Sequence, residues 1–388
     1  MLRKVCSFIL ICIIFICTDS YALDTSKSSI VMDMTTGRVL YEKNPNDKRL
    51  IASTTKIMTA ILAIENSDIK TKVTVGKEIL NMYGTNIYLE LEEEITIEDL
   101  LYGLILRSGN DAAIVLATHI GKTEENFVRM MNEKAKELGM ENTIFQNPHG
   151  LDDYTENYST AYDMALLSSY ASQNKVYQKI TKTKKYKTST QNKSYTWNNR
   201  NKLLSTYRYC TGGKNGYTPK AGRTLVTTAT KDNIKLTIIT LNDPNEYDTH
   251  QYLYKKMYSK YKLYKLIDKN NYQISKDIYK NNYQISKDFS YLLSEEERKN
   301  VKIDVIIDKQ ENTQIIGYLK ITLNDKIIGI VDIYENTQKK EEMNFFQKIS
   351  NYLLDILKKF MLGLQNSLKP GPVVPIPLEI YKSVSLTL

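Results

Sequence analysis

The chain has 388 residues, enough for more than one domain, and its 53 lysines and arginines against 44 acidic residues give a formal net charge of +9. This basic balance favours contact with anionic surfaces such as wall polymers or lipid head groups, although a solvated basic face without a partner would give the same balance; no nucleic-acid-binding motif accompanies it. The three histidines lie far apart and the cysteines lack paired ligand spacing, so we expect no metal site and no cofactor.

Residues 1–22 have the layout of a secretory signal peptide, with two basic residues, an apolar run at 6–17 and small residues before the expected cleavage site after Ala22. We therefore expect export. An uncleaved membrane anchor is the alternative, but the apolar run is shorter than the ~20 residues that span a bilayer. The other three cysteines fall in this leader, so the mature chain keeps only Cys210 and an internal disulfide is excluded.

Residues 29–242 combine strand-like and helix-like patterns. Apolar side chains recur with helical spacing in the middle of this region, and alternation typical of strands occurs at both ends. A hairpin, several helices and then returning strands predict an α+β fold in which strands distant in the sequence pair with each other. The expected elements are a hairpin at 29–41, a helix beginning near Ser53, helices interrupted at 107–110, a helix at 123–138, a helix capped by Ser159 or Thr160, and two strands at 222–242.

The composition changes after about residue 243. Residues 269–277 recur at 280–288 as a local tandem duplication, which indicates a surface insertion or a linker. We expect 261–298 to be a linker that contains this duplication. Alternating apolar residues then predict a small all-β domain at 299–336.

Two further segments follow this domain. Residues 342–365 place their apolar side chains on one helical stripe, which predicts an amphipathic helix. Such a helix either lies in a membrane interface or docks on its own protein. Residues 366–388 contain four of the eight prolines and predict an extended tail.

The pattern Ser-x-x-Lys begins at four serines in this chain, so by itself it has little specificity. The copy formed by Ser53 and Lys56 differs because an apolar helical face follows it, which places Ser53 at a helix N-terminus. Helical spacing puts Lys56 one turn further along the same face, within reach of the serine hydroxyl. A capping serine beside an exposed lysine is the plain structural alternative.

Two more motifs of low individual specificity follow. Ser108 and Asn110 place a hydroxyl and a carboxamide two residues apart at the break between two helices, and Lys214 precedes Gly216 on a strand that starts after a turn. Ser-x-x-Lys opening a helix, then Ser-x-Asn and Lys-x-Gly, is the set of motifs found in penicillin-binding proteins and class A β-lactamases.

The chain resembles the low-molecular-weight penicillin-binding proteins, the serine-type D-alanyl-D-alanine carboxypeptidases. The blocks ASTTKIMTA, ITIEDLLYGLILRSGNDAA, NPHGLDDYTENYSTAYDMALL and GGKNGYTPKAGRTLV carry the resemblance, in the family order, over about residues 28–245. The resemblance implies a β-lactamase/transpeptidase-like α+β fold with an antiparallel sheet packed against helices. It also implies a catalytic domain at 23–260, followed by the small all-β domain and the C-terminal amphipathic helix.

The residue types and the resemblance together suggest catalytic roles. A serine hydroxyl needs a base, so Ser53 is the expected nucleophile and Lys56 the expected base. Burial and a nearby cation such as Lys214 would keep Lys56 neutral part of the time. We expect Ser108 to pass a proton to the leaving amine, and Asn110 to hold Lys56 and the substrate amide.

Four consecutive residues are expected to bind the substrate. Lys214 supplies positive charge for a terminal carboxylate, and the resemblance implies an oxyanion hole made by the backbone N–H groups of Ser53 and Tyr217. One position departs from the family, because Asn215 stands before Gly216 where a threonine is usual. Its carboxamide can still donate a hydrogen bond.

The predicted function is removal of the terminal D-alanine from peptidoglycan stem peptides through an acyl-serine intermediate, with β-lactam antibiotics as further ligands. Export would place the protein in the cell wall or on the outer face of the cytoplasmic membrane. A β-lactamase is one alternative, which the extra β domain and the terminal helix disfavour. The other is a catalytically weak wall-binding protein, which Asn215 slightly favours and the intact Ser53 and Lys56 disfavour.

Overall fold

The computed structural model describes residues 23–274, 283–308, 313–335 and Leu354. The expected signal peptide, the Pro-rich tail and the expected amphipathic helix apart from Leu354 lie outside the described residues. The chain divides into two compact units. The first comprises the described residues up to Asp268 together with 288–302 and 322–326, and the second comprises 269–287, 303–321 and the described residues from 327 onward.

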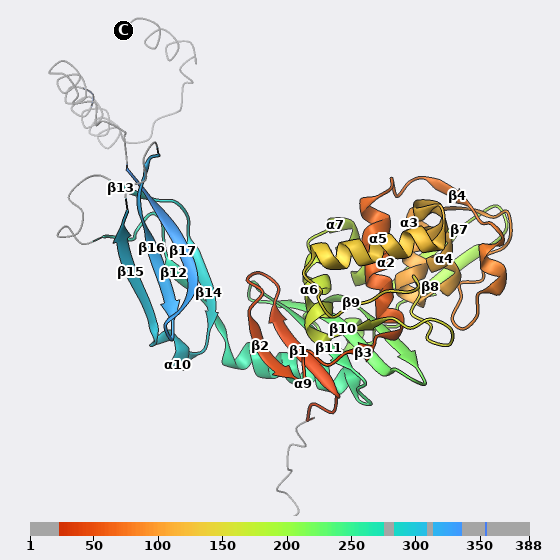
Figure 1. The fold of residues 1–388 in the computed structure, drawn as a ribbon, viewed down its shortest axis with the longest axis horizontal. Coiled ribbons are helices and arrows are strands. Elements are labelled where there is room, and N and C mark those ends of the chain that lie inside the picture. The colour runs from red at the N-terminus through yellow and green to blue at the C-terminus, as the bar shows by residue number, and fades with distance from the viewer. Residues whose placement is uncertain (1–22, 275–282, 309–312, 336–353, 355–388) are drawn as a thin grey trace, which may run out of the picture. The chain divides into compact units, whose positions relative to one another are not determined.

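A five-stranded sheet in the order β2-β1-β11-β10-β9 forms the centre of the first unit (Figure 1). β1 pairs antiparallel with β11, which confirms that strands from distant parts of the sequence lie side by side. The turn between β10 and β11 is tight because Asp232 and Asn233 are both left-handed, with φ of 50° and 64°. The strands are β1 (Ser28–Asp33), β2 (Val39–Lys43), β9 (Cys210–Thr218), β10 (Gly222–Lys231) and β11 (Ile234–Leu241).

Helices cover both faces of this sheet, as Figure 1 shows. On one face Val226 and Ile239 pack with a group of helices, and on the other Leu225 and Ile238 pack against α9 (Glu246–Lys260). Successive side chains of a strand point to opposite faces, so β10 and β11 contribute to both cores. The helical group comprises α2 (Lys56–Glu65), α3 (Ile97–Tyr102), α4 (Asn110–Gly121), α5 (Glu124–Glu137), α6 (Ala161–Ala171) and α7 (Lys175–Lys182).

Local sequence explains most of the helix starts. Thr123 and Thr160 cap α5 and α6, because each side-chain oxygen accepts the backbone N–H three residues further on. The helix expected to begin near Ser53 starts with the 3-10 turn η1 (Ala52–Thr55), and the α-helix α2 begins only at Lys56. Apolar periodicity does not separate a 3-10 turn from the α-helix that continues it.

A hairpin that the sequence analysis did not predict lies in the first unit, formed by β7 (Lys185–Ser189) and β8 (Ser194–Asn198). Tyr195 and Trp197, both on β8, are its only buried side chains. The alternation of buried and exposed residues that marks a strand is therefore clear on β8 and not on β7. The remaining short elements before α9 are β3 (Arg49–Leu50), β4 (Lys72–Thr74), η2 (Lys77–Asn81), β5 (Glu94–Thr96), β6 (Tyr158–Ser159) and α8 (Leu203–Thr206).

The segment 261–298 is not the linker that we expected. It contains β12 (Lys262–Ile267), which pairs antiparallel with β14 (Phe289–Leu293), and the short helix α10 (Glu295–Arg298). Its third strand, β13 (Tyr283–Ile285), pairs with β17. The sequence pattern missed these strands for two reasons. The duplicated sequence is mostly polar, and pairing between strands that are not adjacent in the chain leaves no local sequence pattern.

A four-stranded sheet in the order β13-β17-β16-β15 makes up most of the second unit. Its other strands are β15 (Val301–Ile307), β16 (Ile315–Leu323) and β17 (Lys326–Glu335), which fall within the range expected for a small all-β domain. The domain boundaries themselves stay a prediction. Within the described ranges, no helix has both the length and the apolar character needed to cross a membrane.

Candidate active site

Ser53 lies on a strained turn against which two neighbouring backbone segments pack closely. The preceding residue, Ala52, is buried and has a positive φ of 46°, which is strained for a residue with a side chain. A Cβ on Gly150 would lie 1.9 Å from the Ala52 carbonyl oxygen, and a Cβ on Gly216 would lie 2.8 Å from the Ser53 backbone nitrogen. Both positions therefore require glycine, because the neighbouring loop and strand β9 touch the turn that carries Ser53.

Lys56 occupies a closed polar site directly beside this turn. Its Nζ is hydrogen-bonded to Ser53 Oγ at 3.1 Å and donates to Asn110 Oδ1 at 2.7 Å. A third bond, 2.6 Å long, goes to the carbonyl oxygen of His149. The side chain is 0% exposed, and burial, followed by the charge of Lys214, holds the pKa of Lys56 well below its usual value.

A neutral Lys56 amine fits these three contacts. A neutral amine has two hydrogens and one lone pair. The oxygens of Asn110 and His149 can only accept, so they take the two hydrogens and leave the lone pair for the hydroxyl hydrogen of Ser53. A serine that donates to an uncharged amine is arranged for deprotonation.

Lys214 is the second buried lysine of the site. Its side chain is 1% exposed, and its Nζ donates to the backbone carbonyl of Asn215 at 2.7 Å. Burial, with a smaller effect from the charge of Arg200, lowers the pKa of Lys214 to about 7. With this pKa, Lys214 can change its charge near neutral pH. Arg200, the source of the smaller effect, follows strand β8 and donates to Thr85 Oγ1 at 3.3 Å.

Ser108 and Asn110 lie where the helical geometry changes twice. The π-helical segment η3 (Gly103–Arg107) follows α3, and Ser108 is left-handed with φ of 68° before α4 begins. Asn110 Nδ2 donates to the carbonyl oxygen of Tyr83 at 2.7 Å, which fixes the carboxamide so that its oxygen meets Lys56. Ser108 is buried, and its hydroxyl makes no hydrogen bond to the described residues. The structure thus brings Asn110, but not Ser108, into hydrogen-bond contact with Lys56.

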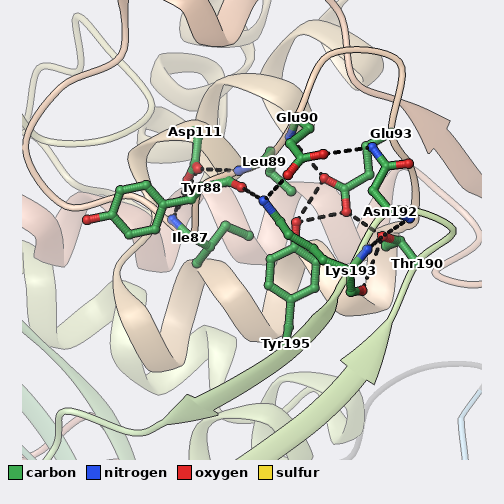
Figure 2. Close-up of polar contacts among 10 residues, drawn as sticks. All are labelled: Ile87, Tyr88, Leu89, Glu90, Glu93, Asp111, Thr190, Asn192, Lys193 and Tyr195. Atoms are coloured by element: carbon green, nitrogen blue, oxygen red, sulfur yellow. Dashed lines mark hydrogen bonds and ion pairs between the residues drawn. The ribbon is translucent and has the colours of Figure 1, made fainter.

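The loop between η2 and β5 is fixed to its neighbours by two carboxylates, as Figure 2 shows. The Asp111 carboxylate accepts the backbone N–H groups of Ile87 and Leu89 at 3.0 to 3.1 Å. The Glu93 carboxylate is 0% exposed and accepts the hydroxyl of Tyr195 at 2.8 Å, on the β7–β8 hairpin. The hairpin therefore supports one end of the loop, while the other end contacts Asn110.

A second loop orients the His149 carbonyl. Asn147 Oδ1 accepts the backbone N–H of His149 at 3.2 Å, and Asn157 Nδ2 donates to the carbonyl oxygen of Asn147 at 3.0 Å. Burial, and then the charge of Lys56, lower the pKa of the His149 imidazole to about 3. Its Nδ1 accepts the backbone N–H of Leu151 at 3.1 Å. The imidazole is therefore neutral at pH 7 and structural, and His149 contributes to the site through its backbone.

These two loops are tied to each other and to the sheet. The Tyr83 hydroxyl donates to Asp153 Oδ2 at 2.6 Å, which links the first loop to the second. The adjacent Asp152 carboxylate accepts the hydroxyl of Thr218 at the end of β9. Asn110 is consequently enclosed, with an exposed fraction of 2%.

The expected substrate-binding residues lie on β9, which is an edge strand of the sheet. Asn215 is half-buried, and its carboxamide makes no hydrogen bond to the described residues. Tyr217 is 61% exposed, and the Arg223 guanidinium lies 5.5 Å from the centre of its ring. No group of three or more His, Cys, Asp or Glu side chains in the described part of the chain is placed to hold a metal ion.

The sequence model of the D-alanyl-D-alanine carboxypeptidases, peptidase family S11, matches residues 18–245, more than half of the chain. The chain belongs to the D-alanyl-D-alanine carboxypeptidase family. Two curated relatives illustrate the similarity. The carboxypeptidase DacF of Bacillus subtilis is 35% identical over 254 residues, which cover 63% of this chain and 65% of DacF. The D-alanyl-D-alanine carboxypeptidase of Streptomyces sp. strain K15 is 36% identical over 218 residues, which cover 52% of this chain and 75% of that relative.

Solved structures of the family share the fold. Penicillin binding protein 5 from Haemophilus influenzae is similar over 81% of this chain and 97% of its own, with a TM-score of 0.67 and 25% identity. A mutant of the Streptomyces K15 DD-transpeptidase is similar over 61% of this chain and 97% of its own, with a TM-score of 0.56 and 31% identity. These similarities confirm the predicted transpeptidase-like α+β fold. The chain spans less than two thirds of several curated relatives: 65% of DacF, 58% of DacA of H. influenzae and 56% of DacC of Escherichia coli.

Three residues of this family member's site were not singled out by the sequence analysis. Asp111 directly follows the Ser-x-Asn motif, and His149 lies in one of the blocks that carry the resemblance, so both had a local signal. Arg200 had none, because it lies on a connection whose position depends on the unpredicted β7–β8 hairpin.

Proposed function

We propose that this family member removes the terminal D-alanine from peptidoglycan stem peptides through an acyl-enzyme on Ser53, and that β-lactam antibiotics acylate the same serine. The observation that carries the proposal is the set of three contacts that Lys56 makes with Ser53, Asn110 and the His149 carbonyl. A buried lysine with a lowered pKa beside a serine hydroxyl is suited to act as a general base. The family match supports the choice of substrate class.

In the acylation step, Ser53 Oγ attacks the carbonyl carbon of the penultimate D-alanine while the Lys56 amine takes the hydroxyl proton. The backbone N–H groups of Ser53 and Tyr217 donate to the oxyanion, and one such donor typically contributes about 10² to 10³ in rate. The C–N bond to the terminal D-alanine then breaks, and its amine leaves with a proton passed from Lys56 through Ser108. Water next attacks the ester and gives a proton to Lys56, which returns one to Ser53.

The edge strand β9 supplies the features needed to bind a peptide. An edge strand has unpaired backbone groups that can bond to an extended segment, and this one carries Lys214 and Asn215. A protonated Lys214 would pair with the terminal carboxylate of the substrate. The unpartnered carboxamide of Asn215 would donate to the same carboxylate in place of the family's threonine hydroxyl.

The test is to incubate the full chain with fluorescent penicillin, to locate the adduct by mass spectrometry, and to measure D-alanine release from a diacyl tripeptide that ends in D-Ala-D-Ala. We expect a lasting adduct on Ser53 together with D-alanine release. An adduct that is hydrolysed rapidly without D-alanine release would indicate a β-lactamase. No adduct and no release would indicate a non-catalytic wall-binding protein.

We also propose that the protein acts outside the cytoplasm and is held at a membrane surface by residues 342–365. The leader pattern and the family's peptidoglycan substrate support export, and the apolar stripe supports the membrane contact. Deletion of residues 342–388 should move the exported protein from the membrane fraction to the soluble fraction without loss of activity on the tripeptide. Unchanged membrane association after the deletion would favour an uncleaved leader as the anchor.

A further inference from the structure

A hollow in the first unit lies outside the peptidase site. It has a volume of about 480 Å³ and is formed by the turn after α8, the end of β10 and one face of α9. α9 packs on the sheet face opposite to the one that packs against α2, so a ligand here would not compete with a peptide at Ser53 (Figure 1). We refer to this hollow as the α9 pocket.

The α9 pocket is basic. Arg208, Lys231 and Lys255 line it, and no carboxylate of the described residues does. Lys231 has one acidic neighbour, Asp232, whose oxygen is 4.0 Å away on a side chain that is 82% exposed. Arg208 and Lys255 form no ion pair with any described residue. The positive charges of Arg208 and Lys255 are therefore not neutralised by any described residue, and that of Lys231 is paired only weakly.

Tyrosine rings hold two of these cations in place. The Arg208 guanidinium lies 4.5 Å from the centre of the Tyr209 ring, and Lys231 Nζ lies 5.5 Å from the same centre. Lys231 Nζ is also 5.9 Å from the centre of the Tyr258 ring. A ring attracts a cation without taking up its charge or all of its N–H donors. The cations are thus partly ordered while donors stay available for an anion, unlike cations that are held by a carboxylate.

The polar groups around the cations indicate the kind of anion. Thr206, Ser259 and Gln251 also line the pocket, and their hydroxyl and carboxamide groups can bond to the hydroxyls of a polyol or a sugar. The volume lies within the range of about 300 to 1,000 Å³ that is usual for small-ligand sites. No residue of the pocket is among the exposed large apolar side chains, which a surface that inserts into lipid would need.

We propose that the α9 pocket binds the phosphate groups of an anionic polymer whose repeating unit is a polyol phosphate. Arg208 and Lys255 donate to the phosphate oxygens, Lys231 adds charge beside them, and the hydroxyl-bearing residues bond to the polyol. The net charge of +9 attracts such a polymer over a longer range, and the pocket gives that attraction a defined position. A protein held in this way keeps its peptidase site free, because the two sites lie on different faces of the sheet.

Binding of the full chain to a synthetic oligo(glycerol phosphate) tests the proposal, measured by titration calorimetry at fixed salt concentration. The pocket variant is Arg208→Gln with Lys255→Gln. The matched control is Lys256→Gln with Lys260→Gln, which removes the same two charges from side chains that do not line the pocket. We expect binding to weaken about tenfold or more in the pocket variant, because charge-assisted hydrogen bonds are lost, and less than about twofold in the control. Thermal melting checks that both variants fold.

Three results would overturn the proposal. The first is no measurable binding of oligo(glycerol phosphate) by the unaltered chain, and the second is equally weakened binding in the pocket variant and the control. The third is a pocket variant whose binding is weakened only toward phosphatidylglycerol vesicles, measured in parallel, and not toward oligo(glycerol phosphate). The second result would mean that net charge alone attracts the polymer, and the third that the pocket recognises a lipid head group. D-alanine release should be the same in all three proteins. Because the binding assay does not require peptidase activity, a failure of the proposed function would not be mistaken for a failure of this one.

Discussion

Two sets of basic side chains lie near opposite faces of the central sheet, and their surroundings differ. Lys56 and Lys214 are 0% and 1% exposed, and burial lowers the pKa of both. Arg208 and Lys255, in the α9 pocket, are exposed to water, which stabilises a charged group. Basic side chains are therefore suited to different tasks in the two places: the lowered pKa of the buried lysines suits them to proton transfer, whereas the exposed cations supply charge.

The two sites also differ in how their cations are held. Lys56 is fixed by hydrogen bonds to three oxygen atoms from three separate segments. The pocket cations Arg208 and Lys231 are held by ring faces, which place a cation less specifically. A base must meet its nucleophile within hydrogen-bond distance, whereas a cation that attracts a polymer phosphate acts through its charge and needs less exact placement.

The largest expected effect comes from the nucleophile. Ser53→Ala should abolish both the penicillin adduct and D-alanine release, because no other hydroxyl of the described residues bonds to Lys56. Binding to oligo(glycerol phosphate) should be unchanged. Fluorescent penicillin labelling and thermal melting are the measurements, and persistent labelling of a folded variant would show that Ser53 is not the nucleophile.

The same substitution made in both regions tests the contrast between base and charge. Lys56→Arg should lower the acylation rate by about 10² to 10⁴, because an arginine stays protonated and cannot take the proton of Ser53. Lys255→Arg keeps the charge of the α9 pocket and should leave both acylation and polymer binding unchanged. Stopped-flow acylation measures the rate, and a Lys56→Arg enzyme of normal rate would exclude Lys56 as the base.

Titration of Lys214 should make kcat/KM change with pH near the lowered pKa of about 7. Above that pH the free enzyme loses the ammonium that pairs with the substrate carboxylate, so kcat/KM should fall as the pH rises, by up to about tenfold per unit. The corresponding fall in kcat should lie at higher pH, because the bound carboxylate favours the charged lysine. Lys214→Arg serves as the control, and a fall that survives this change would belong to another group.

The same shift predicts how stability depends on pH. The folded pKa of Lys214 is lower than the value of 10.5 of an unfolded chain, so between about pH 7 and 10.5 the unfolded state binds more protons. The contribution of Lys214 to the free energy of unfolding should therefore rise with pH across this window. Urea unfolding of the wild type and of Lys214→Met at several pH values measures the difference.

Asn215 should have a smaller effect. Asn215→Thr replaces a longer planar group by a compact hydroxyl on a stiffer side chain, which should bind the terminal carboxylate more favourably. We expect kcat/KM for D-Ala-D-Ala peptides to rise about tenfold, which corresponds to ~1.4 kcal/mol, with the fold unchanged. A slower enzyme would show that asparagine suits this protein's own substrate.

The smallest effect is expected for the bond between the two loops over Asn110. Tyr83→Phe removes the hydroxyl that donates to Asp153 and keeps the ring. A net loss of about 1 kcal/mol or less for a partly exposed hydrogen bond should lower kcat/KM by about threefold. Tyr88→Phe is the matched control, since the Tyr88 hydroxyl on the same loop bonds to no described residue. Equal activities in the two variants would show that the bridge does not support the site.

Local patterns predicted the parts of the molecule that depend on neighbouring residues. Thr160 as a helix cap, the interruption at 107–110 and the strands at 222–242 each follow from turn chemistry or periodicity within a few residues. The linker expected at 261–298 was wrong, because β12 and β14 pair across an intervening segment of the chain. The β7–β8 hairpin was missed, because its strands are mostly polar.

The sequence by itself predicted the candidate reactive groups, through the order of Ser53, Lys56, Ser108, Asn110 and Lys214, and it determined the family. Only the tertiary structure decided their chemical state. The contacts of Lys56 with Asn110 and with the His149 carbonyl join residues 54 and 93 positions apart. A pKa depends on burial and on nearby charges, and both are set by segments that meet only when the chain has folded. A sequence motif can therefore name a base, but packing decides whether that base is neutral.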